Sequence, residues 1–489
     1  MRISDDVAQN QINWQTFVFR FITMSNFCFL IIFSILLTAC SSGSVGKIET
    51  ITIENTGDKN ALMKMVKIRC AKSVDAYVEY WLENKPERKF ITPISRNKQQ
   101  HDICLTNLDF EKIFQCRITI INDNDSLKSE PCTFRTPNLP ETFLDAHVIR
   151  EAQENDVPQE FLSGCLLLYK RDTPGYIILL DHNGNIRWYK NIKTRGVKVA
   201  HYTQQKTILS LLSASDHPNS YGDEILELSL TGDTICHLNK GEKDFQQTIH
   251  HEILLNHKNQ IVTLSVLDKV MDLSSARGGQ ADTVRGDGIT VLNRKGEKVW
   301  GWSIFDELNP LVEKNIINER KDWMHANSLC VDGQGNYIVS FYNNGQIWKI
   351  DSQTGKVIWK FGRNGNYFVP RAARISNVHA AHIDTDNCLR FFDNGVAQRQ
   401  SQAWAFSIDE KSKQVEVKGN TKLPKGIYTD RMGSAYKIGK NTLLICVSKQ
   451  HYIYLTRFNG DILWKMFCVN TPYRAEFIPM SDLSPFITN

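Results

Sequence analysis

The sequence repeats one two-stranded pattern six times, and this repetition constrains the fold more than any other feature. Each copy has an alternating apolar strand, a polar turn and a second strand; five copies have glycine in the turn, and four have tryptophan in the second strand. In five copies, a further apolar strand such as "QIVTLSV" or "TLLICVS" precedes the two-stranded pattern. The pattern predicts a β-propeller of six four-stranded blades. The alternative, a long β-sandwich with chance hairpins, does not readily produce six copies. The copies begin at Tyr176, Ile225, Ile289, Ile347, Ala403 and Ile453.

A different pattern precedes the repeats. Residues 48–137 contain about six or seven short alternating runs, separated by turn-forming residues. Such runs are typical of a small β-sandwich of the immunoglobulin or fibronectin kind. The segment "TPNLPE" (Thr136 to Glu141) is the expected linker. We therefore expect an all-β chain, with the sandwich at residues 48–137 and the propeller at residues 142–489.

Size and charge agree with this division. The chain has 489 residues, which is room for one large β domain and a small one. Hydrophobic residues make up 42% and charged residues 23%, so there is enough apolar material for a core. The net charge of +5 is small for this length, and no dense Lys/Arg block is present. This argues against nucleic acid as a partner.

The first 39 residues are predicted to be a lipoprotein signal peptide. The apolar run at residues 27–39 is shorter than the roughly 20 residues that a membrane-spanning helix needs, and Arg20 precedes it. "LTAC" followed by "SSGS" is similar to a bacterial lipobox, which would make Cys40 the lipidated residue. The alternative is a membrane-anchor helix that stays uncleaved. We expect a protein on the periplasmic side of the cell envelope, anchored to a membrane by lipid.

Four of the twelve cysteines fall in the early region. In an oxidising compartment they could form disulfides, and the sequence leaves all three pairings open. None of the spacings is CxxC, so a zinc ribbon is not indicated. The four are Cys70, Cys104, Cys116 and Cys132.

Histidines recur just before the expected innermost strands of the blades. In a propeller such positions face the axis, so residues about 55 to 75 apart in sequence would converge on one site. Three interpretations compete: hydrogen-bonded structural residues, a metal site, and acid–base or nucleophilic chemistry on an anionic group. No carboxylate or thiolate joins the set at a recurring position, which disfavours metal. The groups are His250 and His251, His325 and Asn327, His379 and His382, and, less clearly, Arg431.

Five segments together resemble the bacterial PAPS-independent aryl-sulfate sulfotransferases. They are "HHE", "DWMHANS", "IWKIDSQTGKVIWKFG", "VHAAHID…FFDNG" and "TPYRAEFI". The resemblance implies a β-sandwich, a six-bladed propeller and transfer of a sulfuryl group from a phenolic sulfate ester to a phenol. It also implies ping-pong kinetics through a sulfohistidine, with no cofactor and no metal. Consistent with this, no P-loop and no GxGxxG segment after a strand is present.

The resemblance assigns roles to the recurring residues. His379 matches the nucleophile, and His325 and Asn327 match sulfate-contacting or proton-transferring residues. One of His250 and His251 matches a further active-site histidine, and the match does not decide which. The expected substrate-binding set is Asn327, Tyr342, Arg431 and His382.

One family residue is missing. Family members often carry an arginine after the "HANS" segment, where this chain has Tyr342. A phenol cannot supply the charge of a guanidinium, so Arg431, or Arg285 in "DTVRGDG", is the hypothetical replacement from another blade. Arg474 in "TPYRAEF" either belongs to the family's C-terminal site segment or closes the last blade through an ion pair.

We therefore expect an aryl-sulfate sulfotransferase. Its partners would be a phenolic sulfate donor, a phenol acceptor and the membrane, with a homodimer left open. A non-catalytic propeller that binds a ligand or partner in its funnel is the alternative class. A quinone- or metal-dependent propeller oxidoreductase is a weaker one. The loops at residues 271–288 and 306–322 either shape the acceptor pocket or are surface insertions.

Overall fold

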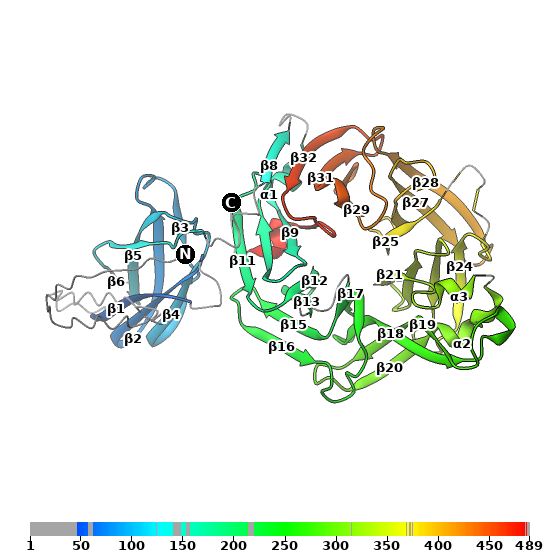
Figure 1. Cartoon of the computed structure of the whole chain (residues 1–489). Coiled ribbons are helices and arrows are strands. Elements are labelled where there is room, and N and C mark those ends of the chain that lie inside the picture. Colours follow the sequence, from blue (N-terminus) through cyan, green and yellow to red (C-terminus); the bar gives the residue numbers. More distant parts are fainter. Residues whose placement is uncertain are drawn as a thin grey trace, which may run out of the picture.

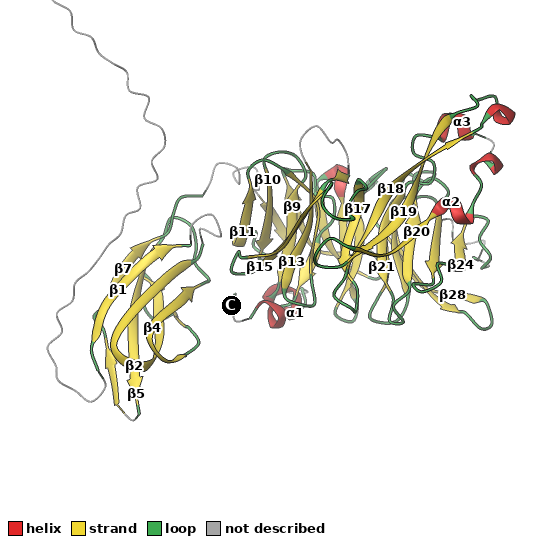
Figure 2. Ribbon diagram, turned by 90° about the horizontal axis from the view of Figure 1, so that it is seen from below, coloured by secondary structure: helices red, strands yellow, loops and turns green. Residues whose placement is uncertain are grey.

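The computed structural model describes residues 46–486 apart from 57–61, 124, 140–147, 153–156, 214–219, 314, 368, 371–372, 374 and 485. The predicted signal peptide and Cys40 lie outside the described residues. Nearly all regular elements are β-strands (Figures 1 and 2), which confirms the all-β prediction. No helix within the described ranges is long and apolar enough to cross a membrane. The short helices are α1 (Gln159–Ser163), α2 (Ile304–Glu307), α3 (Ile316–Glu319) and α4 (Met480–Leu483).

The early region forms a seven-stranded antiparallel sheet that folds over on itself. The long strand β2 (Lys64–Leu82) causes this, because its first half pairs with β1 and β4, and its second half with β3 and β5. Alternate β2 side chains are buried and enclose a core with Ile118 and Phe114. The other strands are β1 (Ile48–Asn55), β3 (Lys89–Ile91), β4 (Ser95–Leu105), β5 (Ile113–Asn122), β6 (Asp125–Lys128) and β7 (Cys132–Arg135).

The four early cysteines are thiols in the structure. Cys116 on β5 lies directly opposite Cys132 on β7, and the two side chains are hydrogen-bonded. Cys104 lies opposite Met65 rather than opposite Cys70. Of the three open pairings, strand register therefore favours the one that contains Cys116–Cys132.

Six sheets surround a central axis, as Figure 1 shows, and confirm the predicted six-bladed propeller. Each hairpin identified in the sequence forms the third and fourth strands of one blade. From the axis outward, the first three blades are β33 (Glu476–Ile478), β9 (Cys165–Lys170), β10 (Gly175–Leu180) and β11 (Ile186–Ile192); β12 (Gly196–Tyr202), β13 (Thr207–Ser213), β15 (Glu224–Ser229) and β16 (Thr234–Asn239); β17 (Ile249–Leu255), β18 (Ile261–Met271), β19 (Asp282–Leu292) and β20 (Lys298–Ser303), with β14 (Tyr221–Gly222) beside β17.

The other three blades follow the same order. They are β21 (Ala326–Val331), β22 (Tyr337–Phe341), β23 (Gln346–Ile350) and β24 (Val357–Gly362); β25 (Val378–Ile383), β26 (Leu389–Asp393), β27 (Gln402–Asp409) and β28 (Gln414–Lys422); β29 (Ser434–Ile438), β30 (Thr442–Val447), β31 (Tyr452–Arg457) and β32 (Ile462–Cys468). Two strands from distant parts of the chain close the ring. The C-terminal strand β33 is the innermost strand of the first blade, and β8 (Val148–Ala152) pairs with β32 at the outside of the last blade.

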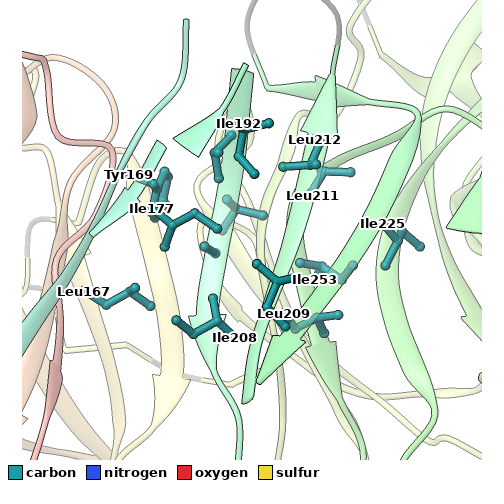
Figure 3. Packing of buried hydrophobic residues seen from close by; sticks show 14 of the residues in the cluster. Leu167, Tyr169, Ile177, Ile192, Ile208, Leu209, Leu211, Leu212, Ile225 and Ile253 are labelled. Carbon is teal, nitrogen blue, oxygen red and sulfur yellow. The ribbon is translucent and has the colours of Figure 1, made fainter. Parts of the chain in front are cut away.

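Apolar side chains fill the space between neighbouring blades. Figure 3 shows one such cluster, in which Leu167, Ile177, Leu209, Ile225 and Ile253 from three blades are fully buried. Burying one such side chain contributes about 1.5–3 kcal/mol relative to leaving it exposed. This packing holds the inner strands, and any side chains that they direct to the axis, in fixed positions.

Three of the innermost strands are irregular near the histidines. β17, β21 and β25 each contain a register shift, and His251, His325 and Ala380 there have φ of 57°, 55° and 51°. Such bulges re-aim side chains and break the alternation of a strand. The prediction that the histidines precede the innermost strands was therefore wrong for β17 and β25. Those two strands contain His250, His251, His379 and His382, and "FFD" ends the second strand, β26.

The third blade extends beyond the others. β18 and β19 continue as a two-stranded arm on one face of the ring, beside α2 and α3 (Figure 2). The backbone N–H of Arg285 in the arm donates to the carbonyl of Arg320 at 2.6 Å, and Trp323 N–H donates back to Arg285 at 3.3 Å. The loops at residues 271–288 and 306–322, named in the sequence analysis, are thus hydrogen-bonded to each other, and the first also bonds to Trp323 just before β21. The 3₁₀ turns are η3 (Ser274–Ala276), η4 (Pro310–Val312) and η5 (Ser448–Gln450).

Candidate active site

A cavity of about 570 Å³ lies at the axis of the ring. Two of its lining residues, Asp322 and His325, follow α3 within six residues in the sequence. Five of the sequence-predicted residues line it: His251, His325, His379, Tyr342 and Arg431. The rest of the lining is Arg171, Ser220, Asp322, Asn343, Val396, Asp430, Met432 and Tyr473.

His379 lies at the base of the cavity in a single tautomer. Its Nδ1 is 2.6 Å from the side-chain oxygen of Asn394. The orientation of that amide is fixed, because its nitrogen donates to the carbonyls of Thr429 and Met432 at 3.0 and 2.8 Å. The oxygen can only accept, so Nδ1 of His379 carries the proton and Nε2 keeps its lone pair.

The environment of His379 also keeps the ring neutral. Burial lowers the pKa of His379 to about 3, and the hydrogen bond to Asn394 only partly offsets this effect. The backbone N–H of Met432 donates a hydrogen bond to Nε2 at 3.3 Å, and the Tyr342 ring packs edge-on at a centroid distance of 5.2 Å. A neutral imidazole with an unprotonated nitrogen at a cavity is a competent nucleophile.

The pKa of His325 shifts in the opposite direction to that of His379. Its Nδ1 lies 2.7 Å from a carboxylate oxygen of Asp322. Burial by itself would lower the pKa of His325, but this hydrogen bond and the charges of Asp322 and Asp287 raise the pKa above its ordinary value. One cavity therefore holds an imidazole whose pKa is lowered and one whose pKa is raised, which is the division of roles that acid–base chemistry needs.

The structure distinguishes between the two adjacent histidines of "HHE". His251 lines the cavity, with its ring 4.9 Å from that of His325. His250 lies behind it, with the two Nδ1 atoms 2.9 Å apart. Burial lowers the pKa of His250 to about 4 and holds the pKa of His251 well below its ordinary value. Both rings are therefore neutral at ordinary pH.

Arg171, which follows β9, supplies a cation that the sequence analysis missed. Its guanidinium lies 4.5 Å from the centre of the Tyr473 ring and donates to Ser220 Oγ at 2.6 Å. The Nε atom is buried and has no hydrogen-bond partner. An arginine with spare donors at a cavity that also holds His325 favours an anionic ligand. In the sequence, "KRDTPG" is indistinguishable from an ordinary polar turn.

The two arginines considered as replacements lie in different places. Arg431 is at the rim of the cavity, 65% exposed, and faces Asp430 at 3.5 Å. Arg285 pairs with Asp268 through two hydrogen bonds of 2.9 and 2.8 Å in the arm, away from the lining. Tyr342 donates its hydroxyl to the carbonyl of Asp430 at 2.8 Å, so it serves as an aromatic wall.

Two expected substrate contacts lie outside this cavity. Asn327 is fully buried, with its amide nitrogen on the carbonyl of Val378 and its oxygen bonded to Ser340, so it joins neighbouring blades. His382 faces a second cavity of about 380 Å³ on the axis, together with His201 and Tyr436. The shift within β25 separates His382 from His379.

An ionic cluster of four side chains lines the second cavity. Arg474 pairs with Glu252 and donates to the carbonyl of Asn327 at 2.8 Å. His201 lies between Glu252 and Glu476, at 2.5 and 2.8 Å. The cluster connects β12, β17, β21 and β33, so Arg474 forms its ion pair with the third blade and not within the last blade.

The His201 ion pairs predict a pH-dependent stability. Burial opposes protonation, but the charges and hydrogen bonds of Glu252 and Glu476 raise the pKa of His201 to about 10. A pKa raised on folding stabilises the native state fully below the unfolded pKa of about 6.5 and is lost as pH rises to about 10. Thermal unfolding should therefore separate wild type from His201→Gln most at pH 6 or below. A separation that stays constant up to the folded pKa would contradict this assignment.

Solved structures with a similar chain trace include a protein of unknown function, a propeller domain and a lyase. A Bacteroides caccae protein of unknown function matches with a TM-score of 0.44 and 10% identity, over 65% of this chain and 99% of its own. The propeller domain of Cps50 (Swd1) from Myceliophteria thermophila matches with a TM-score of 0.35 and 10% identity, over 64% and 89%. Virginiamycin B lyase from Staphylococcus aureus matches with a TM-score of 0.33 and 10% identity, over 66% and 99%.

These values are too low to support an argument about function. No curated protein sequence matches the chain. Among the described residues, no group of three or more His, Cys, Asp or Glu side chains has an arrangement that could hold a metal ion. The family model described as "Arylsulfotransferase (ASST)" matches residues 109–460, which include most of the propeller and every lining residue except Tyr473. The chain belongs to the arylsulfotransferase family.

Proposed function

We propose that this arylsulfotransferase moves a sulfuryl group between phenols through a covalent intermediate on His379, without a nucleotide sulfate donor. The observation that carries the proposal is the fixed tautomer of His379, which leaves Nε2 unprotonated at the base of the cavity. Protonated His325 and Arg171 line the same cavity and supply positive charge for a sulfate ester.

The first half-reaction forms a bond from Nε2 of His379 to sulfur and breaks the bond from sulfur to the aryl oxygen. Sulfuryl transfer, like phosphoryl transfer, spreads negative charge over equatorial oxygens, so positioned cations lower the barrier. His325 has Nδ1 on Asp322, which leaves its Nε2 proton for the departing phenolate. Tyr342 and Tyr473 supply aromatic walls for the phenol ring.

In the second half-reaction an acceptor phenol attacks the same sulfur. The bond from sulfur to Nε2 breaks, and its electron pair returns to His379. Donor and acceptor would thus use one cavity in turn, which is the basis of ping-pong kinetics.

Turnover of a chromogenic aryl sulfate tests the proposal. We expect release of phenol beyond one equivalent per protein only when an acceptor phenol is present, and parallel lines in double-reciprocal plots. Release at the same rate without an acceptor would indicate a hydrolase instead. Absence of release with several donors and folded protein would favour a propeller that only binds its ligand.

We also propose that the protein is a lipoprotein on the periplasmic side of the envelope. The support is the short apolar run, followed by "LTAC" and a polar segment. Labelling with a radioactive fatty acid in cells should mark the wild-type protein but not Cys40→Ser.

A further inference from the structure

Behind the catalytic cavity lies a row of three titratable side chains, two of which do not reach the cavity. His251 contacts His250 through the two Nδ1 atoms, 2.9 Å apart. On the far side, Nε2 of His250 lies 3.4 Å from Oδ1 of Asp287. His250 and Asp287 are 3% and 7% exposed, and neither lines the cavity.

The hydrogen-bonding capacity of this row is not used up by other groups. The Nε2 atom of His250 and the Oδ2 atom of Asp287 are buried without a hydrogen-bond partner. A buried polar atom without a partner costs free energy, so one such atom on each of these two adjacent side chains indicates a role beyond packing. Burial raises the pKa of Asp287 to about 7, so this carboxyl can exchange a proton near neutral pH.

We propose that His250 and Asp287 are positioning residues that let His251 accept the proton of the acceptor phenol. The inference rests on the proposed sulfuryl transfer. As the phenol oxygen bonds to sulfur, its proton moves to Nε2 of His251. The Nδ1 proton of His251 passes to Nδ1 of His250, and the Nε2 proton of His250 passes to Asp287.

This transfer balances in atoms and charge. His250 and His251 each gain one proton and lose one, so both stay neutral, while Asp287 changes from carboxylate to carboxylic acid. The stored proton then returns through the same row to the neutral His325 left by the first half-reaction, whose ring is 4.9 Å from that of His251. No oxidant, reductant or further reactant is needed.

Other groups around the row act on its protonation. The Tyr221 ring on β14 packs edge-on against His250 at 6.0 Å, and the Ser265 backbone on β18 partly opposes the lowering of the His250 pKa. The Ala326 backbone hydrogen-bonds to Asp287, which favours the carboxylate. The charged groups that act on the row from the arm and from the loop before β21 are Arg285, Asp322 and His325.

The test compares two acceptors in the full-length protein, with a donor whose leaving phenol is acidic enough to depart without a proton. One acceptor is phenol, with a pKa of about 10 as for tyrosine, and the other is a fluorinated phenol that is already ionised at about pH 8. With phenol, Asp287→Asn should lower kcat by about 10- to 100-fold, because proton removal is then impaired. With the ionised acceptor, kcat should stay within about twofold of wild type, since there is no proton to remove.

The loss with phenol should also shrink as pH rises towards about 10, where phenol ionises by itself. Asp386→Asn, at a carboxylate bonded to Lys437 on the surface, is the matched control and should change neither rate. Equal losses with both acceptors, or no loss with phenol, would overturn the proposal. If Asp287→Asn does not fold, His250→Asn provides the same comparison. Failure of wild type to transfer to any phenol would instead contradict the proposed function.

Discussion

Replacing His379 by alanine should abolish covalent labelling by an aryl sulfate. Brief exposure of wild type to the donor without an acceptor should add the mass of one sulfuryl group, and peptide mapping should locate it on His379. The physical reason is that Nε2 of His379 is the unprotonated nitrogen at the base of the cavity. Loss of a covalent nucleophile typically lowers kcat by at least about 10⁴-fold, so His379→Ala should show neither adduct nor turnover.

The Asn394→Ala variant tests whether His379 itself, and not a neighbouring histidine, is the nucleophile. Asn394→Ala removes the acceptor that fixes the Nδ1 tautomer but keeps the imidazole itself. This variant should still form the adduct, at a rate lower by roughly 10²-fold or more, since a wrong tautomer impairs a well-placed imidazole. An adduct that maps to His251 or His325, or that persists in His379→Ala, would reassign the nucleophile.

Replacing Arg171 by glutamine should lower kcat/KM for the aryl sulfate by about 10²–10³-fold, the usual effect of losing one charged donor at a developing anion. Both parameters should change, because the guanidinium would contact the sulfate in the ground state and in the transition state. Arg171→Lys should recover only part of the loss, since an ammonium cannot reproduce the planar fork of donors. Steady-state kinetics with several aryl sulfates measure the effect.

Arg195→Gln is the matched control for this experiment. Arg195 is on a neighbouring loop and is held by Asp223 and Glu224 at 2.8 and 3.0 Å. Its loss should leave kcat/KM within about twofold of wild type, as for most partly exposed ion pairs. If Arg171→Gln behaved like this control, Arg431 at the rim would become the candidate for sulfate recognition.

The sequence predicted the outer parts of each blade well and the inner parts poorly. A hairpin such as the one at Ile347 contains its own turn and its own alternation of apolar and polar residues, so a short stretch of sequence is enough to predict it. The innermost strands are short and bulged, and "IHHEILL" has no period of two because His251 is in a left-handed conformation. The histidines were therefore recognised as a set, although two of their strands were misplaced.

The missed site residues depend on contacts that no local window contains. Asn394 was part of a quoted motif, but it looks like a turn residue until its amide is seen between His379 and Thr429. Arg171 lines the same cavity as the histidines only because the ring brings residues of different blades together at the axis. Asn327 matched the family motif, yet its amide is used for contacts between blades.

The closure of the ring by β33 has a consequence for the timing of activity during synthesis. Tyr473 and Arg474 immediately precede this strand; the first lines the catalytic cavity, and the second holds Glu252, the residue after His251. The cavity therefore lacks a wall, and Glu252 lacks its cation, until residues 473–478 have emerged and β33 has paired with β9. A nascent or C-terminally truncated chain can hold every histidine and still be inert, so the activity begins only when the propeller is complete.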